Sequence, residues 1–155
     1  MIPAGGGAGR AHRPTNGHGA GARVELFRAW LVRFGDAWEA RDAAAITALF
    51  APGAVVQPDP FRDAVRGKPG ILAYWAELLG MASADRIRGG STALSFEAEV
   101  LGAGERHGVA HWTVTDGGHV RDGILLAAFD ASGRCTSFRQ WWHASDAERG
   151  GASPD

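Results

Sequence analysis

Large apolar residues recur at helical spacing early in the chain, with charged residues between them. Apolar positions three or four residues apart lie on one face of an α-helix. The pattern predicts a helix over 23–40, whose apolar face is formed by Phe27, Trp30, Leu31, Phe34 and Trp38. Two further helices are predicted over 43–50, where Asp42 is a suitable N-cap, and over 71–79.

Beyond Gly80 the pattern changes to the alternation of apolar and polar residues that is typical of β-strands. Strands are predicted around 96–100, over 109–115 and over 120–129, and a short one over 54–57 precedes the third helix. Helices first and strands afterwards favour an α+β fold. We therefore expect three N-terminal helices packed on one face of a strongly curved antiparallel sheet.

The last strand follows a turn that begins at Asp130 and contains Gly133, which can take the left-handed conformation that such a turn requires. Alternation then sorts the strand into two faces. One face carries Phe138, Gln140 and Trp142, and the other carries Arg139, Trp141 and His143. A glutamine between two large aromatic residues suggests a wall that grips a small molecule.

Composition narrows the function classes. The chain has 155 residues, enough for one domain, and its net charge of −1 gives no electrostatic case for nucleic acid. The lone Cys135 excludes an internal disulfide and fits a reducing cytoplasm, and no apolar run approaches the roughly 20 residues of a membrane span. Low-complexity composition predicts disorder over 1–22 and 146–155, which leaves a folded domain over 23–145.

Metal binding is not expected. His107 and His111 are four residues apart, but on a strand this spacing separates them by about 13 Å on one face. The glycines at 117–118 form a hairpin turn with no helix after it, so they do not form a phosphate loop.

Several motifs occur in an order that resembles one family. They are Ala-Leu-Phe-Ala-Pro-Gly-Ala-Val-Val over 48–56, Asp59-Pro60, Val-Arg-Gly-Lys over 65–68, and the ending Phe-Arg-Gln-Trp-Trp over 138–142. The chain resembles the SnoaL-like branch of the nuclear transport factor 2-like superfamily. The resemblance implies a cone-shaped fold whose pocket binds small apolar molecules, reactions without a cofactor, and dimers that pack sheet to sheet.

The resemblance also implies site residues. In the related ketosteroid isomerases the base is an Asp before a Pro, which matches Asp59, whereas the two oxyanion donors fall on Phe34 and Leu125 and are missing. The last-strand acid of limonene epoxide hydrolases falls on Gln140. Asp59 could still act as the carboxylate of a SnoaL-type cyclase; alternatively, it only caps a loop between two prolines.

The sequence thus yields two sets of candidate residues beside Asp59. The expected ligand pocket, whose members could instead be plain core, is lined by Phe34, Trp38, Tyr74, Trp112, Leu125, Phe138, Gln140 and Trp142. The expected outer face, which we interpret as a homodimer interface, carries His111, Arg139, Trp141 and His143. Glu97, Glu99 and Arg121 could join either the outer face or the mouth of the pocket.

These observations favour a cofactor-independent, cytoplasmic enzyme of the isomerase, cyclase or lyase type that acts on a hydrophobic small molecule, with Asp59 as general base. Two alternatives remain open. The same fold could bind a small molecule without turning it over, or it could serve as a dimerisation module with a filled core.

Overall fold

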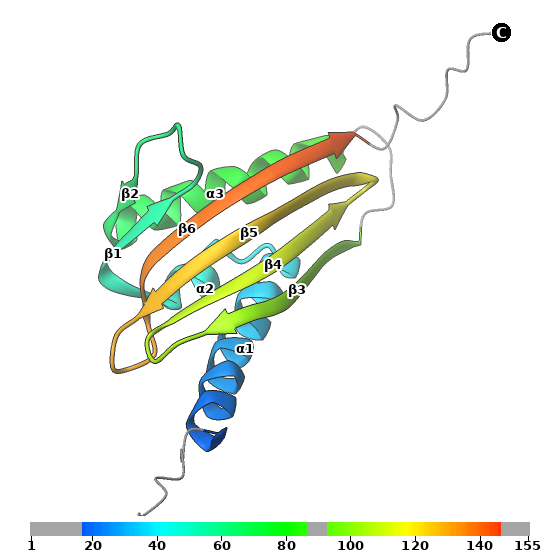
Figure 1. The fold of residues 1–155 in the computed structure, drawn as a ribbon. Helices are drawn as coiled ribbons and strands as arrows, with labels where there is room; N and C mark the ends of the chain where they lie inside the picture. The colour runs from blue at the N-terminus through cyan, green and yellow to red at the C-terminus, as the bar shows by residue number, and fades with distance from the viewer. Residues whose placement is uncertain (1–16, 87–92, 147–155) are drawn as a thin grey trace, which may run out of the picture.

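The computed structural model describes residues 17–86 and 93–146. The predictions for 1–16 and 147–155 lie outside these residues. These residues form three helices and a six-stranded sheet, arranged as in Figure 1. In chain order the elements are α1 (Gly17–Glu39), α2 (Ala43–Ala48), β1 (Phe50–Gln57), β2 (Val65–Arg66), α3 (Gly67–Arg86), β3 (Leu94–Ala103), β4 (His107–Asp116), β5 (His119–Phe129) and β6 (Cys135–Asp146).

The sheet has the strand order β2-β1-β6-β5-β4-β3. β3 to β6 form an antiparallel meander, and β1 and β2 are also antiparallel to each other. The sheet is mixed, however, because β1 lies parallel to β6. The expectation of a wholly antiparallel sheet is therefore wrong at this one pairing. Alternation within a strand defines its two faces and says nothing of its direction relative to a distant strand.

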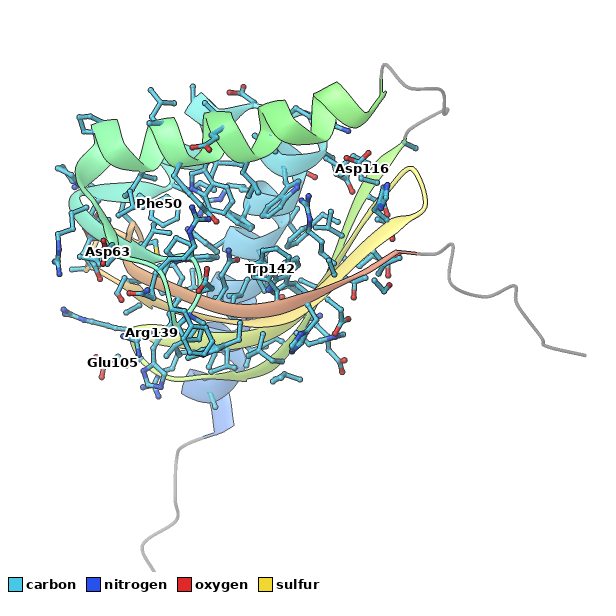
Figure 2. All side chains as sticks on the ribbon, turned by 90° about the horizontal axis from the view of Figure 1, so that it is seen from above. Phe50, Asp63, Glu105, Asp116, Arg139 and Trp142 are labelled. Carbon is cyan, nitrogen blue, oxygen red and sulfur yellow. The ribbon has the colours of Figure 1, made fainter. Side chains whose placement is uncertain are left out.

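Helices cover one side of the sheet, and the sheet curves around them (Figure 2). α1 packs mainly on β3, and α3 packs on β1 and α2. The prediction of three N-terminal helices is wrong, because β1 and β2 come between α2 and α3 in the chain. α1 also begins six residues before its predicted start, and α3 continues to Arg86 rather than ending at 79.

The helix cap and the turn that the sequence predicted are both present in the structure. The Asp42 carboxylate accepts a hydrogen bond from the Ala45 backbone N–H at 2.9 Å and caps α2. Gly133 has φ 81°, the left-handed conformation expected in the turn before β6. Gly123 on β5 lies opposite Trp142, and a Cβ there would collide with the Trp141 carbonyl. A glycine at this position therefore lets β5 and β6 lie close together beneath Trp142.

Aromatic rings dominate the interior. The largest side chains with almost no exposed surface are Trp30, Trp75, Trp112, Phe34, Phe50 and Phe138. Phe34 of α1 is central to this cluster, with ring centroids 5.1 Å from Trp30, 5.6 Å from Trp75 and 5.5 Å from Phe138. Such ring pairs add to the free energy of burial, so the aromatic core ties α1 and α3 to the sheet. No helix in the described part of the chain is both long and apolar enough to cross a membrane.

Candidate functional site

The alternation of β6 places its side chains on the two faces of the sheet. Phe138 and Gln140 are buried on the inner face, whereas Trp141 is 41% exposed on the outer face. Figure 2 shows Trp142 on the side of the sheet that faces α3 and Arg139 on the other side. One strand thus supplies residues both to the interior and to the exposed surface.

The predicted pocket residues come together, but they leave almost no space. Phe34, Trp38, Trp112, Leu125 and Phe138 are all 3% exposed or less. A small cavity of about 10 Å³, which we call the aromatic chamber, is lined by Trp38, Tyr74, Leu78, Trp112, Arg121, Gln140 and Trp142. This volume suits about one water molecule and no larger ligand. The open hollow that the sequence suggested is therefore closed by rings in this conformation.

Two polar side chains meet in this apolar setting. Gln140 from β6 donates a hydrogen bond from Nε2 to the Tyr74 hydroxyl oxygen of α3, at 3.3 Å. Gln140 is only 2% exposed, and its Oε1 is buried with no hydrogen-bond partner among the described residues. Since the Tyr74 oxygen accepts this bond, its own O–H proton is left for another acceptor. The pair therefore presents one donor and one acceptor to the chamber.

Charged residues act on Tyr74 through space. Burial raises the pKa of Tyr74 to about 12, with Arg62 and Arg121 lowering it and Asp59 raising it. The phenol is therefore neutral at ordinary pH and can donate a hydrogen bond. The guanidinium of Arg121 lies 5.8 Å from the ring centroid of Trp142, and both residues line the chamber. Arg121 belongs to the chamber rather than to the outer face, whereas Glu97 and Glu99 are exposed on β3.

Asp59 lies in the loop between β1 and β2. One carboxylate oxygen accepts the Phe61 backbone N–H at 2.8 Å, and the Asp59 carbonyl oxygen accepts a hydrogen bond from Gln57 Nε2 at 2.7 Å. Asp59 thus organises its loop, as the alternative interpretation expected. The other carboxylate oxygen has no hydrogen-bond partner within the described residues, and Asp59 is close enough to Tyr74 to influence its pKa. A carboxylate therefore acts electrostatically on the neutral phenol that lines the chamber.

The outer face carries its own polar pairs. His111 Nε2 lies 2.8 Å from an Asp122 carboxylate oxygen, which also accepts a hydrogen bond from the Thr113 hydroxyl at 2.9 Å. Hydrogen bonds from Thr113 and then His111 lower the pKa of Asp122. The Arg139 guanidinium lies 6.0 Å from the Trp141 ring centroid, and His143 is exposed beside Asp122 across the β5–β6 pairing. The four expected interface residues therefore share one exposed surface.

Sequence reasoning missed a larger cavity of about 500 Å³. It lies where the β3–β4 and β5–β6 turns meet the first half of α1. No residue lines both this cavity and the aromatic chamber. Over residues 17–86 and 93–146, no three His, Cys, Asp or Glu side chains form a group that could hold a metal ion.

Comparison with known proteins identifies relatives. The SnoaL-like domain family matches residues 31–144. A steroid Δ-isomerase from Nocardioides simplex is 31% identical over 124 residues, which cover 77% of this chain and 91% of the relative. The family match begins within α1, includes the Asp59 loop and ends in β6, so the similarity is not confined to one motif.

Solved structures agree on the fold. A SnoaL-like protein of unknown function from Burkholderia thailandensis has a TM-score of 0.61 at 23% identity, covering 77% of this chain and 95% of its own. SalBIII, an epoxide hydrolase/cyclase-like enzyme of pyran ring formation in salinomycin, has a TM-score of 0.59 at 14% identity, covering 79% and 92%. These similarities show the nuclear transport factor 2-like fold, as the sequence motifs predicted.

Proposed function

The chain belongs to the SnoaL-like domain family, and from this premise we propose a cofactor-independent isomerase or cyclase that acts on a hydrophobic small molecule in the aromatic chamber. The reaction class follows relatives that include a steroid Δ-isomerase and an epoxide hydrolase/cyclase-like enzyme. The apolar character of the substrate follows from the tryptophan and leucine side chains that line the chamber.

The observation that carries this proposal is the Tyr74–Gln140 pair. A polar pair in an aromatic core costs free energy unless all its groups are satisfied, and Gln140 Oε1 is not. A ligand with a carbonyl oxygen would accept the free Tyr74 O–H, and a ligand hydroxyl would satisfy Gln140 Oε1. The pair is therefore suited to orient an apolar molecule that carries one or two oxygen atoms.

The residues also suit a proton transfer. In this reaction the Asp59 carboxylate removes a proton from the carbon next to a substrate carbonyl, and the C–H electron pair moves to form an enolate. Tyr74 donates its hydrogen bond to the enolate oxygen and remains protonated, since its pKa is about 12. Asp59 then returns the proton to a different carbon, which moves the double bond without any net oxidation. Tyr74 would thus act in place of the donors that are missing at Phe34 and Leu125.

Two arginines near Tyr74 also favour formation of the enolate. Arg62 and Arg121 both lower the pKa of Tyr74, which means that their fields stabilise negative charge at the phenol oxygen. An enolate oxygen bonded to that phenol would experience the same fields. The two arginines therefore contribute to stabilising the charge that develops during the reaction.

Binding requires the chamber to open, because about 10 Å³ holds no substrate. Among the tryptophans that line the chamber, Trp142 is the one best suited to move. It is only partly buried, whereas Trp38 and Trp112 are 3% and 2% exposed. In this proposal Trp142 rotates outward with Arg121 and the substrate takes its place. Side-chain rearrangements of this kind on binding are common.

The test uses a steroid ketone whose double bond is not yet conjugated, with ultraviolet absorbance reporting the conjugated product. We expect Asp59→Asn to lower kcat at least about 100-fold and Tyr74→Phe to lower it by a similar factor. Asp63→Asn, an exposed acid of the same loop, serves as the matched control and should leave kcat unchanged. Turnover that survives Asp59→Asn would exclude Asp59 as the base.

The filled chamber favours one alternative, a protein that binds an apolar ligand without turning it over. Tryptophan fluorescence separates the two functions, because three tryptophans line the chamber. Quenching by the ketone without product formation, equal in the wild type and Asp59→Asn, would support binding alone. No quenching by steroid, terpenoid or aromatic polyketide ligands would refute both.

The outer face supports a proposal about assembly. Trp141 is 41% exposed and Leu126 is 37% exposed, and both lie among the polar pairs of this face. Exposed aromatic and arginine side chains are enriched in the centre of protein interfaces. A second copy of the chain that packs sheet to sheet would bury them.

A further inference from the structure

The large cavity is a distinct feature of the fold, and we call it the basic cleft. Its volume of about 500 Å³ falls within the range of small-molecule sites, whereas the aromatic chamber is about 10 Å³. It lies at the end of the sheet where the β3–β4 and β5–β6 turns approach the first half of α1 (Figure 1). The lining residues are Arg23, Leu26, Phe27, Trp30, Arg33, Ala48, Leu49, Gly104, Glu105, Arg106, His107, Phe129, Asp130, Ala131, Ser132, Gly133 and Arg134.

One part of the cleft lining is apolar and aromatic. Phe27 and Trp30 of α1 are stacked with centroids 6.4 Å apart, and Phe129 of β5 meets Trp30 edge to face at 5.3 Å. These rings belong to the packed core or its edge, so this part of the lining is rigid. Leu26 extends it with a side chain that is 74% exposed. A rigid apolar surface beside an exposed leucine is suited to the flat or linear apolar part of a ligand.

The rest of the lining is cationic. Four arginines line the cleft, against two carboxylates, Glu105 and Asp130. Within the described residues, no ion pair involves Arg23, Arg33 or Arg106. Formal charges of four arginines and two acids leave the lining at +2. Arginines that lack a carboxylate partner around a cavity favour an anionic occupant.

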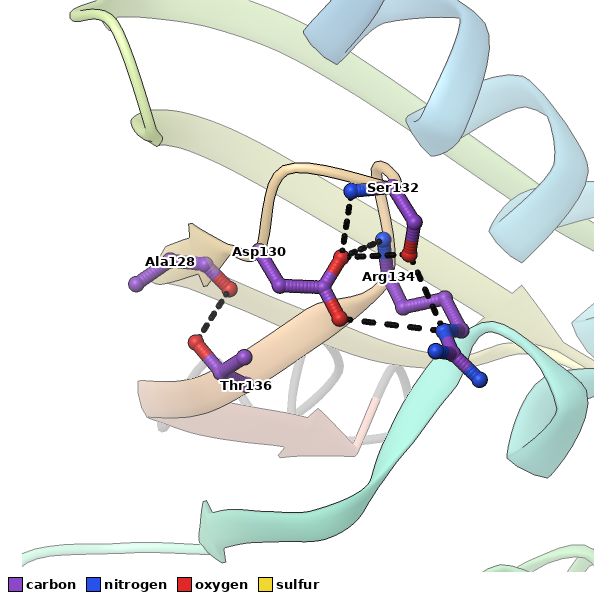
Figure 3. Close-up of polar contacts among 5 residues, drawn as sticks. All are labelled: Ala128, Asp130, Ser132, Arg134 and Thr136. Atoms are coloured by element: carbon purple, nitrogen blue, oxygen red, sulfur yellow. Dashed lines mark hydrogen bonds and ion pairs between the residues drawn. The ribbon is translucent and has the colours of Figure 1, made fainter.

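The turn before β6 holds the fourth arginine and occupies one acid with hydrogen bonds (Figure 3). Asp130 Oδ1 accepts hydrogen bonds from the Ser132 N–H, the Ser132 hydroxyl and the Arg134 N–H, at 2.9, 2.6 and 3.0 Å. These bonds lower the pKa of Asp130. Arg134 Nε is held 3.1 Å from Ser132 Oγ and 3.7 Å from Asp130 Oδ2, which leaves its two terminal nitrogens for another partner. The Asp130 carboxylate is thus committed to the turn and does not compete for Arg23, Arg33 or Arg106.

We propose that the basic cleft is a second small-molecule site, separate from the aromatic chamber, for an amphipathic organic anion. Such a ligand has an apolar ring system or chain and one carboxylate, sulfonate or phosphate group. The apolar part lies against Leu26 and the partly buried Phe129, whose ring packs on Phe27 and Trp30 of the core, and the anionic group is bound by the arginines that line the cleft. Residues 1–16 contain two arginines and no acid, so their charge argues against them as the occupant.

A pair of probes that differ in charge tests the proposal. The anion is 1-anilinonaphthalene-8-sulfonate and its neutral counterpart is N-phenyl-1-naphthylamine, both titrated by fluorescence and calorimetry against the full chain. In the double variant Arg23→Gln/Arg106→Gln we expect the anion to lose at least about tenfold in affinity, with the neutral probe changed less than about twofold. Arg28→Gln is the matched control on α1, since Arg28 does not line the cleft, and it should change neither affinity.

A second variant removes the volume instead of the charge. Ala48 and Ala131 are exposed and line the cleft, so tryptophan at either position would fill it with little effect on the core. Ala48→Trp, with Ala131→Trp as its replacement if the first fails to fold cooperatively, should weaken both probes at least about tenfold. An unchanged anion affinity in the arginine variant or in the filled variant overturns the proposal, and so does a failure of the anion to bind the wild type.

The same titration distinguishes this site from the proposed function. Asp59→Asn changes the proposed base and Trp142→Ala changes the aromatic chamber, and both should leave the anion affinity unchanged. If these variants weaken the anion and the arginine variants do not, the probe binds in the chamber and the second site is refuted. If both probes bind the cleft while no ketone is turned over, the second site stands and the proposed function fails.

Discussion

Gln140→Leu should make this protein more stable while removing the proposed ketone isomerisation. Gln140 is 2% exposed, its Oε1 has no partner among the described residues, and its one side-chain hydrogen bond, to Tyr74, is long at 3.3 Å. An unsatisfied buried acceptor costs about 1–3 kcal/mol, whereas an ordinary hydrogen bond contributes about 0.5–1.5 kcal/mol. Leucine has a similar size and removes the first term while losing at most the second. We expect a net gain of about 1 kcal/mol in the free energy of unfolding.

Urea denaturation followed by tryptophan fluorescence measures this gain. The midpoint should rise with an unchanged slope, and the melting temperature should rise by about 3–5 °C. The only other glutamine of the chain gives a matched control. Gln57 Nε2 donates to the Asp59 and Arg62 carbonyl oxygens, so Gln57→Leu should lower stability by about 1 kcal/mol.

The opposite outcome would refute this reasoning. If Gln140→Leu lowers the free energy of unfolding by 1 kcal/mol or more, Oε1 is satisfied in solution and the polar pair is structural. A more stable variant that no longer binds or turns over the ketone would show the pair to be kept at a cost in stability, as is common at functional sites.

Three further outcomes are expected. Trp142→Ala should lower the free energy of unfolding by about 2 kcal/mol, because the ring is only partly buried, and added indole should restore part of the lost melting temperature. Trp141→Asp should convert a dimer to a monomer in light scattering, and a wild type that is already monomeric at micromolar concentration would refute the proposed interface. Hydrogen bonds from Ser132 and Arg134 hold the folded-state pKa of Asp130 below that of a free Asp side chain, so the stabilisation is present above the unfolded-state pKa and is lost as the pH falls through the folded-state pKa. Melting curves of Asp130→Asn should therefore depend less on pH between about 5 and 2 than those of the wild type, and identical pH profiles would contradict this.

Local patterns in the sequence predicted much of the fold. The apolar face of α1 was visible because helical spacing and burial coincide at Phe27, Trp30 and Phe34. The two faces of β6 followed from strict alternation, and the Asp42 cap followed from residue type alone. In each case the signal lies within a few residues of the feature that it predicts.

The misplaced features depend on longer distances or on weak local signals. The glycines at 17, 19 and 21 favoured a tail on intrinsic propensity, whereas the structure continues α1 through them. The parallel pairing of β1 with β6 joins strands separated by more than 70 residues, and no local pattern records it. The resemblance to a known family correctly indicated the fold but not whether the pocket is open.

The sequence also did not predict the volumes of the two cavities. Counting aromatic residues suggested an open pocket, but free volume depends on how rings from α1, α3, β4 and β6 pack together, and here they fill the space. The basic cleft is built from separate segments, namely α1, the end of α2 and two turns. Its arginines are scattered over more than 100 positions of the chain, so they form no cluster in the sequence.

The polar groups of the aromatic chamber and the large free volume of the basic cleft therefore lie at different places in this molecule. The chamber has a neutral phenol and an unsatisfied amide but almost no space, whereas the cleft has space and a positively charged lining. In the proposed reaction, substrate entry requires Trp142 to move, so the rate should depend on that movement. Trp142→Phe shortens the ring and keeps the wall apolar, so it should raise the rate of substrate association while leaving proton transfer unchanged. Stopped-flow fluorescence would measure this, and an association rate equal to that of the wild type would mean that the substrate enters by another route.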